Sequence, residues 1–403
     1  MYKRLNVKDG NMKIGIFGGS FDPVHIEHIH LAQAAIAELG LDTLLIMPAY
    51  APPHKPYKVL TADEHRLQMC RLAFAGVAGA EVSDFEIRQK GTSYTYVTCQ
   101  HLKEQYPDAQ LFWLVGTDML RDFPTWKYPE RILQNVTLAV CARNEENGWL
   151  EIEQKAFFQK FGCSFQVLSY QGADVSSTKI RVLASAGESI AHLVGERVQA
   201  YIQDNGLYLV PNAQAALALE KPPRKAHSLR VAEVAAKKAA QLRMSEKQAI
   251  TAALFHDCAK NVERTSPLLQ GFALPTEFGQ VPEQVVHQFA GAYIAQTQFG
   301  VTDEDILNAV RYHTSGRENM SPLEKLIFLA DMVEEERNYD VVEDIRSAFW
   351  SAQGDINSAL DGCLLLALQQ TAIFLQRIGQ TVYPLTLRAL QFYENQRKNG
   401  GNI

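Results

Sequence analysis

Residues 13–30 read KIGIFGGSFDPVHIEHIH, and this stretch decides the fold of the N-terminal half. Its apolar start predicts a short strand, the pair Gly18-Gly19 predicts a turn, and the residues that follow have helical spacing. Strand and helix signals keep alternating up to residue 210. This alternation is typical of a parallel sheet with crossover helices, so we expect an α/β fold in the first half.

The pattern changes after residue 210, where strand signals stop and long helices with apolar periodicity begin. We therefore expect an all-α second domain. The predicted domains are a tail or mis-set start at 1–11, the α/β domain at 12–210, a linker with a short helix at 211–225 and the helical domain at 226–395. The predicted strands are 13–17, 43–47, 80–83, 110–115, 137–142 and 166–168. The predicted helices are 28–39, 64–74, 93–106, 177–186, 193–204, 228–242, 246–258, 283–298, 304–312, 322–336 and 356–377.

The composition of the 403-residue chain is that of an ordinary globular protein, with 47% hydrophobic residues and a net charge of −6. The acidic balance gives no indication of a nucleic-acid partner. Six cysteines without a CxxC pair indicate free thiols in a reducing cytoplasm. We see no membrane-spanning run and no signal peptide, and a homo-oligomer is left open.

Two stretches of the first half can bind anions. Ligands of open parallel sheets lie at the carboxyl ends of the strands, where Gly18 and Gly19 end the first predicted strand. His25 and His28 follow at the start of a helix, three residues apart and on one face. Far downstream, VSSTKIR (175–181) places hydroxyl side chains and two cations at another helix start. Either stretch alone can be an ordinary turn or N-cap, but two together favour a phosphate site.

Seven blocks, in order, resemble the (H/T)xGH nucleotidyltransferases, and in detail bacterial nicotinate-nucleotide adenylyltransferase. They are KIGIFGGSFDPVH, MPAYAPPHK, GTSYTYVT, LVGTDML, FPTWKYPERIL, VSSTKIR and NGLYL. The resemblance implies a Rossmann-like domain that transfers AMP from ATP to nicotinate mononucleotide with Mg²⁺, releasing pyrophosphate. Such chemistry depends mainly on positioning and on charge stabilisation.

The resemblance also implies roles for individual residues. At ATP it places Gly18, Gly19, Ser20, Phe21, His25, His28, Gly116, Asp118, Ser177, Thr178 and Arg181. At nicotinate mononucleotide it places Lys55, Thr92, Ser93, Tyr94, Thr95 and Trp126. Those that act on the reacting phosphates are His25, His28, Lys55 and Arg181. Trp126 could instead be a packing residue, although its place in a loop favours stacking on the pyridine ring.

Glu27 departs from the family pattern, which has glycine between these two histidines. A carboxylate repels nearby phosphates unless it points away or engages Mg²⁺. The sequence therefore leaves the geometry at Glu27 open.

The second half carries six imidazole and carboxylate residues at predicted helices or helix ends. They are His227, His256, Asp257, His287, His313 and Asp331. Asp331 shares a helix face with Leu323 and Ile327, and a carboxylate on an apolar stripe must be paired or bound to metal. Each histidine alone can be a satisfied core residue, but the set with its His-Asp pair indicates Fe, Mn, Zn or a similar metal.

Five blocks resemble the HD-domain phosphohydrolases, and in detail the bacterial symmetrical diadenosine tetraphosphate hydrolase. They are KAHSLRVAEVA, AALFHDCAKN, VHQFAGAYIA, ILNAVRYHTSGR and LEKLIFLADMVEEER. The resemblance implies cleavage of diadenosine tetraphosphate to two ADP by two transition-metal ions, with iron expected. One metal would be held by His227, His256, Asp257 and Asp331. Asp257 would bridge to a second metal held by His287 and His313.

Lys260 and Arg317 would bind the tetraphosphate, with Asp257 and Lys260 as the catalytic pair, although both cations could simply be solvated surface residues. We keep two alternatives. The helical domain could be a nucleotide-sensing module with little turnover. The first domain could use nicotinamide mononucleotide, phosphopantetheine or a cytidylyl acceptor as its substrate.

Overall fold

The computed structural model describes residues 12–53, 59–141, 147–173 and 175–399. Lys55 and the expected tail at 1–11 lie outside these residues. The chain divides into two compact units. The first contains Met1–Ile180 and Ser189–Leu207, and the second contains Arg181–Glu188 and Tyr208–Ile403. Each unit is described by itself. In the described residues, no helix is both long and apolar enough to cross a membrane.

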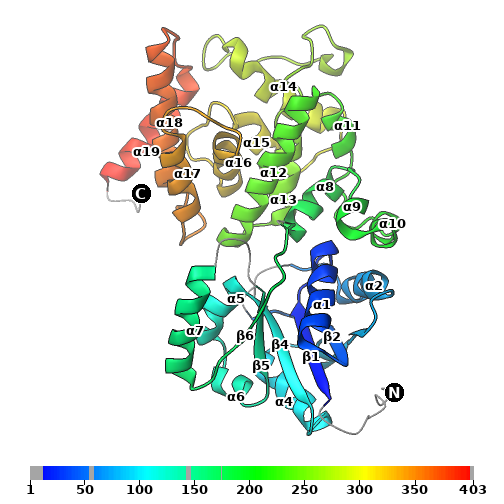
Figure 1. The fold of residues 1–403 in the computed structure, drawn as a ribbon. Helices are drawn as coiled ribbons and strands as arrows, with labels where there is room; N and C mark the ends of the chain where they lie inside the picture. The colour runs from blue at the N-terminus through cyan, green and yellow to red at the C-terminus, as the bar shows by residue number, and fades with distance from the viewer. Residues whose placement is uncertain (1–11, 54–58, 142–146, 174, 400–403) are drawn as a thin grey trace. The chain divides into compact units, whose positions relative to one another are not determined.

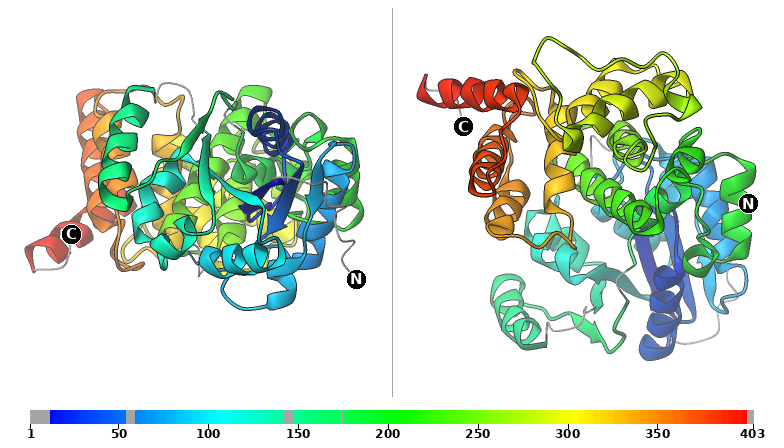
Figure 2. Two further views of the ribbon diagram at one scale, coloured as in Figure 1. Left: turned by 60° about the horizontal axis from the view of Figure 1, so that its bottom comes forward. Right: turned by 90° about the horizontal axis from the view of Figure 1, so that it is seen from above.

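The first unit is built on a parallel sheet of six strands in the order β3-β2-β1-β4-β5-β6 (Figures 1 and 2). The strands are β1 (Lys13–Gly19), β2 (Thr43–Pro48), β3 (Ala80–Val82), β4 (Gln110–Gly116), β5 (Thr137–Cys141) and β6 (Gln166–Leu168). The expectation of a parallel α/β sheet is confirmed. Strand order reverses between β1 and β4, and ligands of such sheets bind outside the strand ends at this point.

Helices connect these strands, as the sequence pattern predicts for parallel neighbours. The connecting elements are α1 (Ile26–Leu39), α2 (Asp63–Phe74), α3 (Phe85–Gln89), α4 (Thr95–Gln105), α5 (Thr117–Asp122), the 3₁₀ turn η1 (Phe123–Thr125), α6 (Pro129–Leu133) and α7 (Asn147–Phe161). After the last strand come α8 (Ser177–Ser185), α9 (Ala191–Val194) and α10 (Glu196–Asp204). The sequence analysis did not predict α3, α5, α6 or α7. Three of these have only five or six residues, too few to show a helical period.

Alternate residues of the central strands form one hydrophobic core. Ile14 and Ile16 of β1 join Trp113 of β4 in this core, because every second side chain of a strand points to the same face. Gly18 has a packing role here, since a Cβ at this position would lie 3.0 Å from the Trp113 ring. The absence of a side chain at Gly18 therefore leaves room for the Trp113 ring of the neighbouring strand β4.

The second unit consists of helices (Figures 1 and 2). They are α11 (Ala213–Leu217), α12 (Pro222–Leu242), α13 (Glu246–Phe255), the 3₁₀ turn η2 (Pro267–Leu269), α14 (Glu283–Thr297), α15 (Glu304–Tyr312), α16 (Pro322–Val333), α17 (Val342–Ser351), α18 (Asp361–Arg377) and α19 (Pro384–Lys398). Side chains of α12, α13, α15, α16 and α18 share a single core cluster. The all-α prediction is confirmed for this unit.

Three boundaries differ from the expected ones in ways that the local contacts explain. The segment 211–225 holds α11 and the first turn of α12, because Pro222 supplies a preorganised first helical residue after Lys221. The end of α8 from Arg181 onward belongs to the second unit. Helix α18 begins at Asp361 rather than at 356, since Asp355 accepts hydrogen bonds from Asn357 and Ser358 in a turn.

Candidate active sites

The first site lies at the strand ends where the sheet order reverses. Gly18 and Gly19 end β1, and Gly116 ends the neighbouring β4. Gly116 is also the N-cap of α5, and the exposed Asp118 turns back over it, with Oδ1 only 2.7 Å from where a Cβ would stand. The structure thus brings these four expected ATP residues to one edge of the sheet.

His25 and His28 form the start of α1 and contact each other. His25 is the N-cap residue, and its backbone N–H donates to Nδ1 of His28 at 3.1 Å. The two rings lie 3.6 Å apart between centroids. Burial and the adjacent His25 both lower the pKa of His28 well below its usual range. Because Nδ1 accepts a hydrogen bond, the neutral ring carries its proton on Nε2, where it can donate to a ligand.

Arg66 of α2 is a positioning residue that the sequence analysis missed. It is only 1% exposed, and its guanidinium donates to the carbonyls of Ser20, Ala49 and Thr61 at 2.7–2.9 Å. The side chain therefore ties the loop after β1 to the loop after β2. An arginine in the polar sequence of α2 gave no sign of this burial.

The N-terminus of α8 lies beside the loop that precedes His25. Ser177 donates from Oγ to the carbonyl of Pro23 at 3.0 Å, so two stretches more than 150 residues apart in the sequence meet here. Thr178 follows in the same turn and is half-buried. Arg181 belongs to the second unit and forms a salt bridge with Glu246 at 2.6 Å. Its assignment to ATP stays a prediction.

The blocks MPAYAPPHK and GTSYTYVT are brought together in the first unit. Ser93 accepts from the backbone N–H of Tyr50 through Oγ, and its own N–H donates to Ala51, both at 2.9 Å. Ala51 also pairs with Thr92 in a short parallel bridge. Thr95 begins α4, with Tyr94 as its N-cap. Thr92, Ser93, Tyr94 and Thr95, four of the expected pyridine-side residues, therefore lie in one loop cluster.

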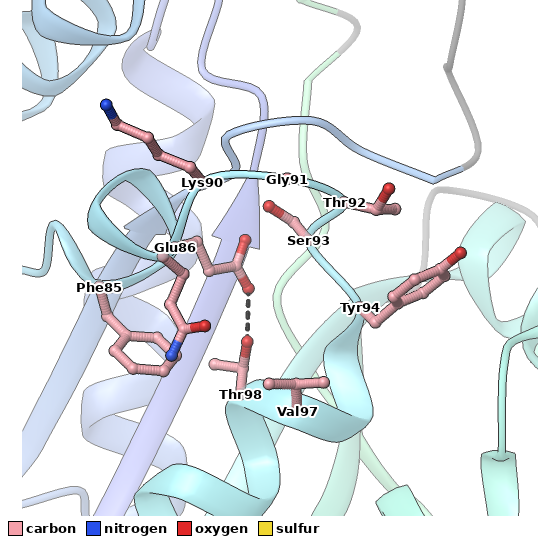
Figure 3. Close-up of a pocket in the computed structure, with 10 residues that line it drawn as sticks. Phe85, Glu86, Lys90, Gly91, Thr92, Ser93, Tyr94, Val97 and Thr98 are labelled. Carbon is pink, nitrogen blue, oxygen red and sulfur yellow. Dashed lines mark hydrogen bonds between the residues drawn. The ribbon is translucent and has the colours of Figure 1, made fainter.

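A small pocket opens at this cluster (Figure 3). It is lined by Phe85, Glu86, Gln89, Lys90, Gly91, Thr92, Ser93, Tyr94, Val97 and Thr98. Glu86 is buried and accepts a hydrogen bond from Oγ1 of Thr98 at 2.7 Å. Burial raises the pKa of Glu86, and hydrogen bonds from Thr98 and Ser93 only partly oppose this. The lining of the pocket thus includes both a buried carboxylic acid, Glu86, and a cation, Lys90.

Trp126 lies in the core of the first unit. It is 6% exposed, and its ring packs 5.2 Å from that of Phe123. The structure therefore gives Trp126 a packing role, and stacking on a pyridine ring stays a prediction.

The carboxylate of Glu27 faces the segment between β6 and α8. Its Oε2 accepts from Oη of Tyr170 at 2.5 Å and from the backbone N–H of Ala173 at 2.8 Å, while Oε1 lies 3.2 Å from Nδ1 of His30. Burial opposes ionisation, but these three partners outweigh it and lower the pKa of Glu27. The carboxylate charge is thus compensated within the protein.

The second site gathers its six expected ligands in the helical unit. His227 comes from α12, His287 from α14 and Asp331 from α16. His256 and His313 are the residues at which α13 and α15 end, and Asp257 follows His256. The His-Asp pair therefore lies in a turn past the helix end, where the helical prediction for 246–258 was too long.

Three groups of possible ligands have their atoms within 4.8 Å of one another. They are His227 with His256 and Asp257, His256 with His313 and Asp331, and Asp257 with His287 and His313. Asp257 is central, because its carboxylate lies 3.2 Å from His287 and 3.6 Å from both His256 and His313. This arrangement matches a carboxylate shared between two metal ions.

The ring orientations of two histidines are fixed by backbone carbonyls outside the cluster. Nδ1 of His256 lies 2.6 Å from the carbonyl of Ala253, and Nδ1 of His313 lies 2.8 Å from that of Val310. A carbonyl only accepts, so each Nδ1 carries the proton and Nε2 presents a lone pair to the site. Nε2 of His256 is buried without a hydrogen-bond partner in the described residues, as a metal ligand would be.

The charge states also suit metal binding. Burial lowers the pKa of His256 and of His287 to about 4, despite the opposing field of Asp257. Burial opposes ionisation of Asp257 and Asp331, but neighbouring imidazoles, and Arg337 for Asp331, lower the pKa of both carboxyl groups. Neutral imidazoles and ionised carboxylates are the forms that bind cations.

The cations around this cluster agree only in part with the expected ones. Lys260 lies beside it, with Nζ 3.2 Å from Nε2 of His287. Arg317 instead makes a two-pronged salt bridge with the buried Glu324, so its assignment to the tetraphosphate stays a prediction. The sequence analysis missed Arg224, whose Nη1 lies 2.9 Å from Asp257, and Arg337, which pairs with Asp331.

Comparison with known families agrees with these two units. Residues 16–183 match the Cytidylyltransferase-like family, and residues 224–336 match the HD domain family. The fold and site thus define an α/β nucleotidyltransferase-type domain joined to a helical domain with a buried His/Asp cluster. A Mycoplasma genitalium protein named "Probable nicotinate-nucleotide adenylyltransferase/Ap4A hydrolase" is 30% identical, covering 81% of this chain and 89% of that protein.

A Mycoplasma pneumoniae protein of the same name is 31% identical over the same shares of both chains. The present chain belongs to this family of two-domain proteins. Among solved structures, a predicted HD superfamily hydrolase involved in NAD metabolism from Clostridium acetobutylicum is 27% identical, with a TM-score of 0.39. It covers 46% of this chain and 95% of that one.

Proposed function

We propose that the chain is a bifunctional enzyme of adenine nucleotides. The first unit transfers AMP from ATP to nicotinate mononucleotide, giving nicotinate adenine dinucleotide and pyrophosphate. The second unit hydrolyses diadenosine tetraphosphate symmetrically to two ADP. The names of the two Mycoplasma relatives, which cover both units, support this pair of reactions.

The position of His28 carries the first half of the proposal. Its Nδ1 is occupied by the backbone N–H of His25, which leaves an Nε2–H donor at the strand ends. A donor that is already oriented stabilises charge developing on a transferring phosphoryl group without reorganisation. We assign Gly18, Gly19, Ser20, Phe21, His25, Gly116, Asp118, Ser177, Thr178 and Arg181 to ATP as well. Mg²⁺ would bind together with ATP, coordinated by the ATP phosphates, as is common in such sites.

The pocket at the GTSYT block supports a small planar acceptor. Thr92, Ser93 and Tyr94 line it together with Lys90, Thr95 begins the adjoining helix α4, and we assign Lys55 and Trp126 to the same substrate. A cation such as Lys90 favours the carboxylate of nicotinate over the amide of nicotinamide.

Product analysis after incubation with ATP and either mononucleotide tests this assignment. We expect nicotinate adenine dinucleotide to form with a kcat/KM at least tenfold above that for nicotinamide mononucleotide. Preference for the amide, or turnover only with a phosphopantetheine or cytidylyl substrate, would overturn it.

The shared position of Asp257 carries the second half of the proposal. His227, His256 and Asp331 would hold one transition metal with Asp257, which would also reach a second metal held by His287 and His313. Two such metals lower the pKa of a bound water and stabilise the leaving oxygen. Iron is the metal we expect. Lys260 would contact the tetraphosphate, and we add Arg224 and Arg337 because their guanidinium groups already lie at the ligand carboxylates.

Metal analysis combined with turnover of diadenosine tetraphosphate tests this half. We expect two equivalents of metal per chain in the wild type, and at least a hundredfold loss of hydrolysis in His256→Ala and Asp257→Ala. A sensing module would instead bind the nucleotide without turnover, so equal and slow hydrolysis in all three proteins would favour that alternative.

The proposal places the enzyme in the cytoplasm, where free thiols persist. No disulfide bond joins any of the six cysteines, all of which lie among the described residues, and five of them are buried. We propose no nucleic-acid partner, and a homo-oligomer remains open to measurement by light scattering.

A further inference from the structure

The segment between β6 and α8 is anchored to α1 at two successive points, and the start of α8 is anchored to the loop just before α1. The backbone N–H of Ser169 donates to Glu38 at 2.7 Å, near the C-terminal end of α1. Tyr170 and Ala173 contact Glu27 in the first turn of the same helix. The segment therefore runs back along α1, from its last turn to its first.

The third anchor lies where α8 begins. Ser177 donates to the carbonyl of Pro23, two residues before His25. Consequently Glu27 is the middle anchor, and it is the one that stands between the two histidines. The fit around it is close, since a Cβ at Gly172 would lie 3.2 Å from Oε2 of Glu27. Its side chain is only 13% exposed.

Both oxygens of Glu27 have partners in the protein. Oε2 accepts two hydrogen bonds and Oε1 faces His30. Because its oxygens already have these partners, the carboxylate is poorly placed to bind substrate or Mg²⁺ directly. Glu27 instead links two elements of the first unit that we expect to bind anions. They are the histidine turn at the start of α1 and the start of α8, which carries hydroxyl side chains.

We propose that Glu27 is a positioning residue for adenylyl transfer, which holds the start of α8 at a fixed distance from His25 and His28. The inference rests on the proposed function of the first unit. A polyphosphate that spans the two elements is bound in reacting geometry only when their separation is fixed. Misplacement of reacting groups by about 1 Å can cost on the order of a hundredfold in rate.

Steady-state kinetics of Glu27→Gly, Tyr170→Phe and the double variant test the proposal. We expect kcat for adenylyl transfer to fall about 10- to 100-fold in Glu27→Gly and less in Tyr170→Phe. The double variant should be no slower than Glu27→Gly, because Glu27→Gly already removes the hydrogen bond that Tyr170→Phe removes. The dependence of rate on Mg²⁺ should not change. Glu38→Gln, at the opposite end of α1, is the matched control, because its amide oxygen can still accept from the Ser169 N–H, and it should keep kcat within about twofold.

Two results would overturn the proposal. In the first, Glu27→Gly lowers kcat and raises the Mg²⁺ concentration needed for activity, while Tyr170→Phe keeps the wild-type kcat. That result would mean that the carboxylate contacts the substrate or its Mg²⁺. The other is an unchanged kcat in all variants. Hydrogen exchange provides a readout apart from activity, since amides of residues 170–178 should exchange faster in Tyr170→Phe even if Glu27→Gly fails to fold. A wild type inactive with ATP and nicotinate mononucleotide would instead refute the proposed function itself.

Discussion

Nδ1 of His227 lies 3.1 Å from Oε1 of Glu334, while Nε2 of the same ring lies 2.9 Å from Asp331. Glu334 is itself 3% exposed at its side chain and is held by Arg230 at 2.6 Å. The carboxylate of Glu334 therefore fixes the ring so that Nε2 faces the cluster. A carboxylate that hydrogen-bonds to a metal-binding histidine orients the imidazole and raises its basicity.

Glu334→Gln should accordingly weaken metal binding by about 10- to 100-fold. The amide keeps the volume of the side chain but loses the charge that stabilises the Nδ1–H of His227. Metal content after dialysis against a graded chelator measures the effect. Glu336→Gln is the matched control, because Glu336 also pairs with Arg230 but is 68% exposed and does not touch His227. Equal metal loss in both variants would show that Arg230 pairing, and not ring orientation, matters.

The hydrogen-bond pattern of His28 predicts a difference between two amide substitutions. His28→Asn keeps an acceptor near Nδ1 for the His25 N–H, and His28→Gln keeps a donor near Nε2. Loss of one donor to a developing charge costs on the order of 100- to 1000-fold in kcat. We therefore expect adenylyl transfer to fall by about 100-fold or more in His28→Asn and by less in His28→Gln.

His30→Asn is the control for this pair, since His30 is exposed on the same helix. Its kcat should stay within about threefold of the wild type. If His28→Asn were the faster of the two His28 variants, the acceptor at Nδ1 would matter more than the donor, and the role assigned to Nε2 would be wrong.

The sequence predicted most of the sheet because a buried parallel strand has a short, continuous apolar signature. The six expected strands are the six observed, with ends that differ by two residues or fewer. Two helices of the second unit were missed although they carry a helical period. Val342, Ile345 and Phe349 are buried along α17, and Leu385, Ala389 and Tyr393 are buried along α19. A full periodicity scan of residues 337–399 could have found both.

The sequence could name candidate metal ligands but not the residues that surround them. Histidine and aspartate carry a chemical signal in any sequence, so all six candidates were found, and they meet in one cluster. Glu334, Arg224 and Arg66 carry no such signal, because glutamate and arginine are common on helix surfaces. Only the packing of distant helices reveals that these three are partly or fully buried and hydrogen-bonded.

Arg66 provides a stability prediction for the first unit. Arg66→Lys keeps the charge, but a single ammonium cannot reach the carbonyls of Ser20, Ala49 and Thr61 together. At least one buried carbonyl then loses its donor, and the free energy of unfolding should fall by about 2–3 kcal/mol. Urea unfolding followed by tryptophan fluorescence measures the change. The exposed Arg71→Lys on the same helix should change it by less than about 0.5 kcal/mol.

Glu86 gives a pH dependence of stability with a definite sign. Burial raises its pKa above the usual 4.5, so the folded state holds the proton after the unfolded state has released it. Stability contributed by this group is full below pH 4.5 and declines as the pH rises toward the folded-state pKa. Glu86→Gln stays neutral at every pH and can still accept from Thr98.

The variant should therefore gain stability relative to the wild type as the pH rises from 4 to 7. Thermal unfolding midpoints of both proteins at several values in this range measure the gap. Glu81→Gln, an exposed site in β3, controls for the loss of one negative charge. A gap that stays constant or shrinks toward pH 7 would mean that Glu86 ionises as readily in the folded protein as in the unfolded chain, and the acid in the pocket would then be charged when substrate binds.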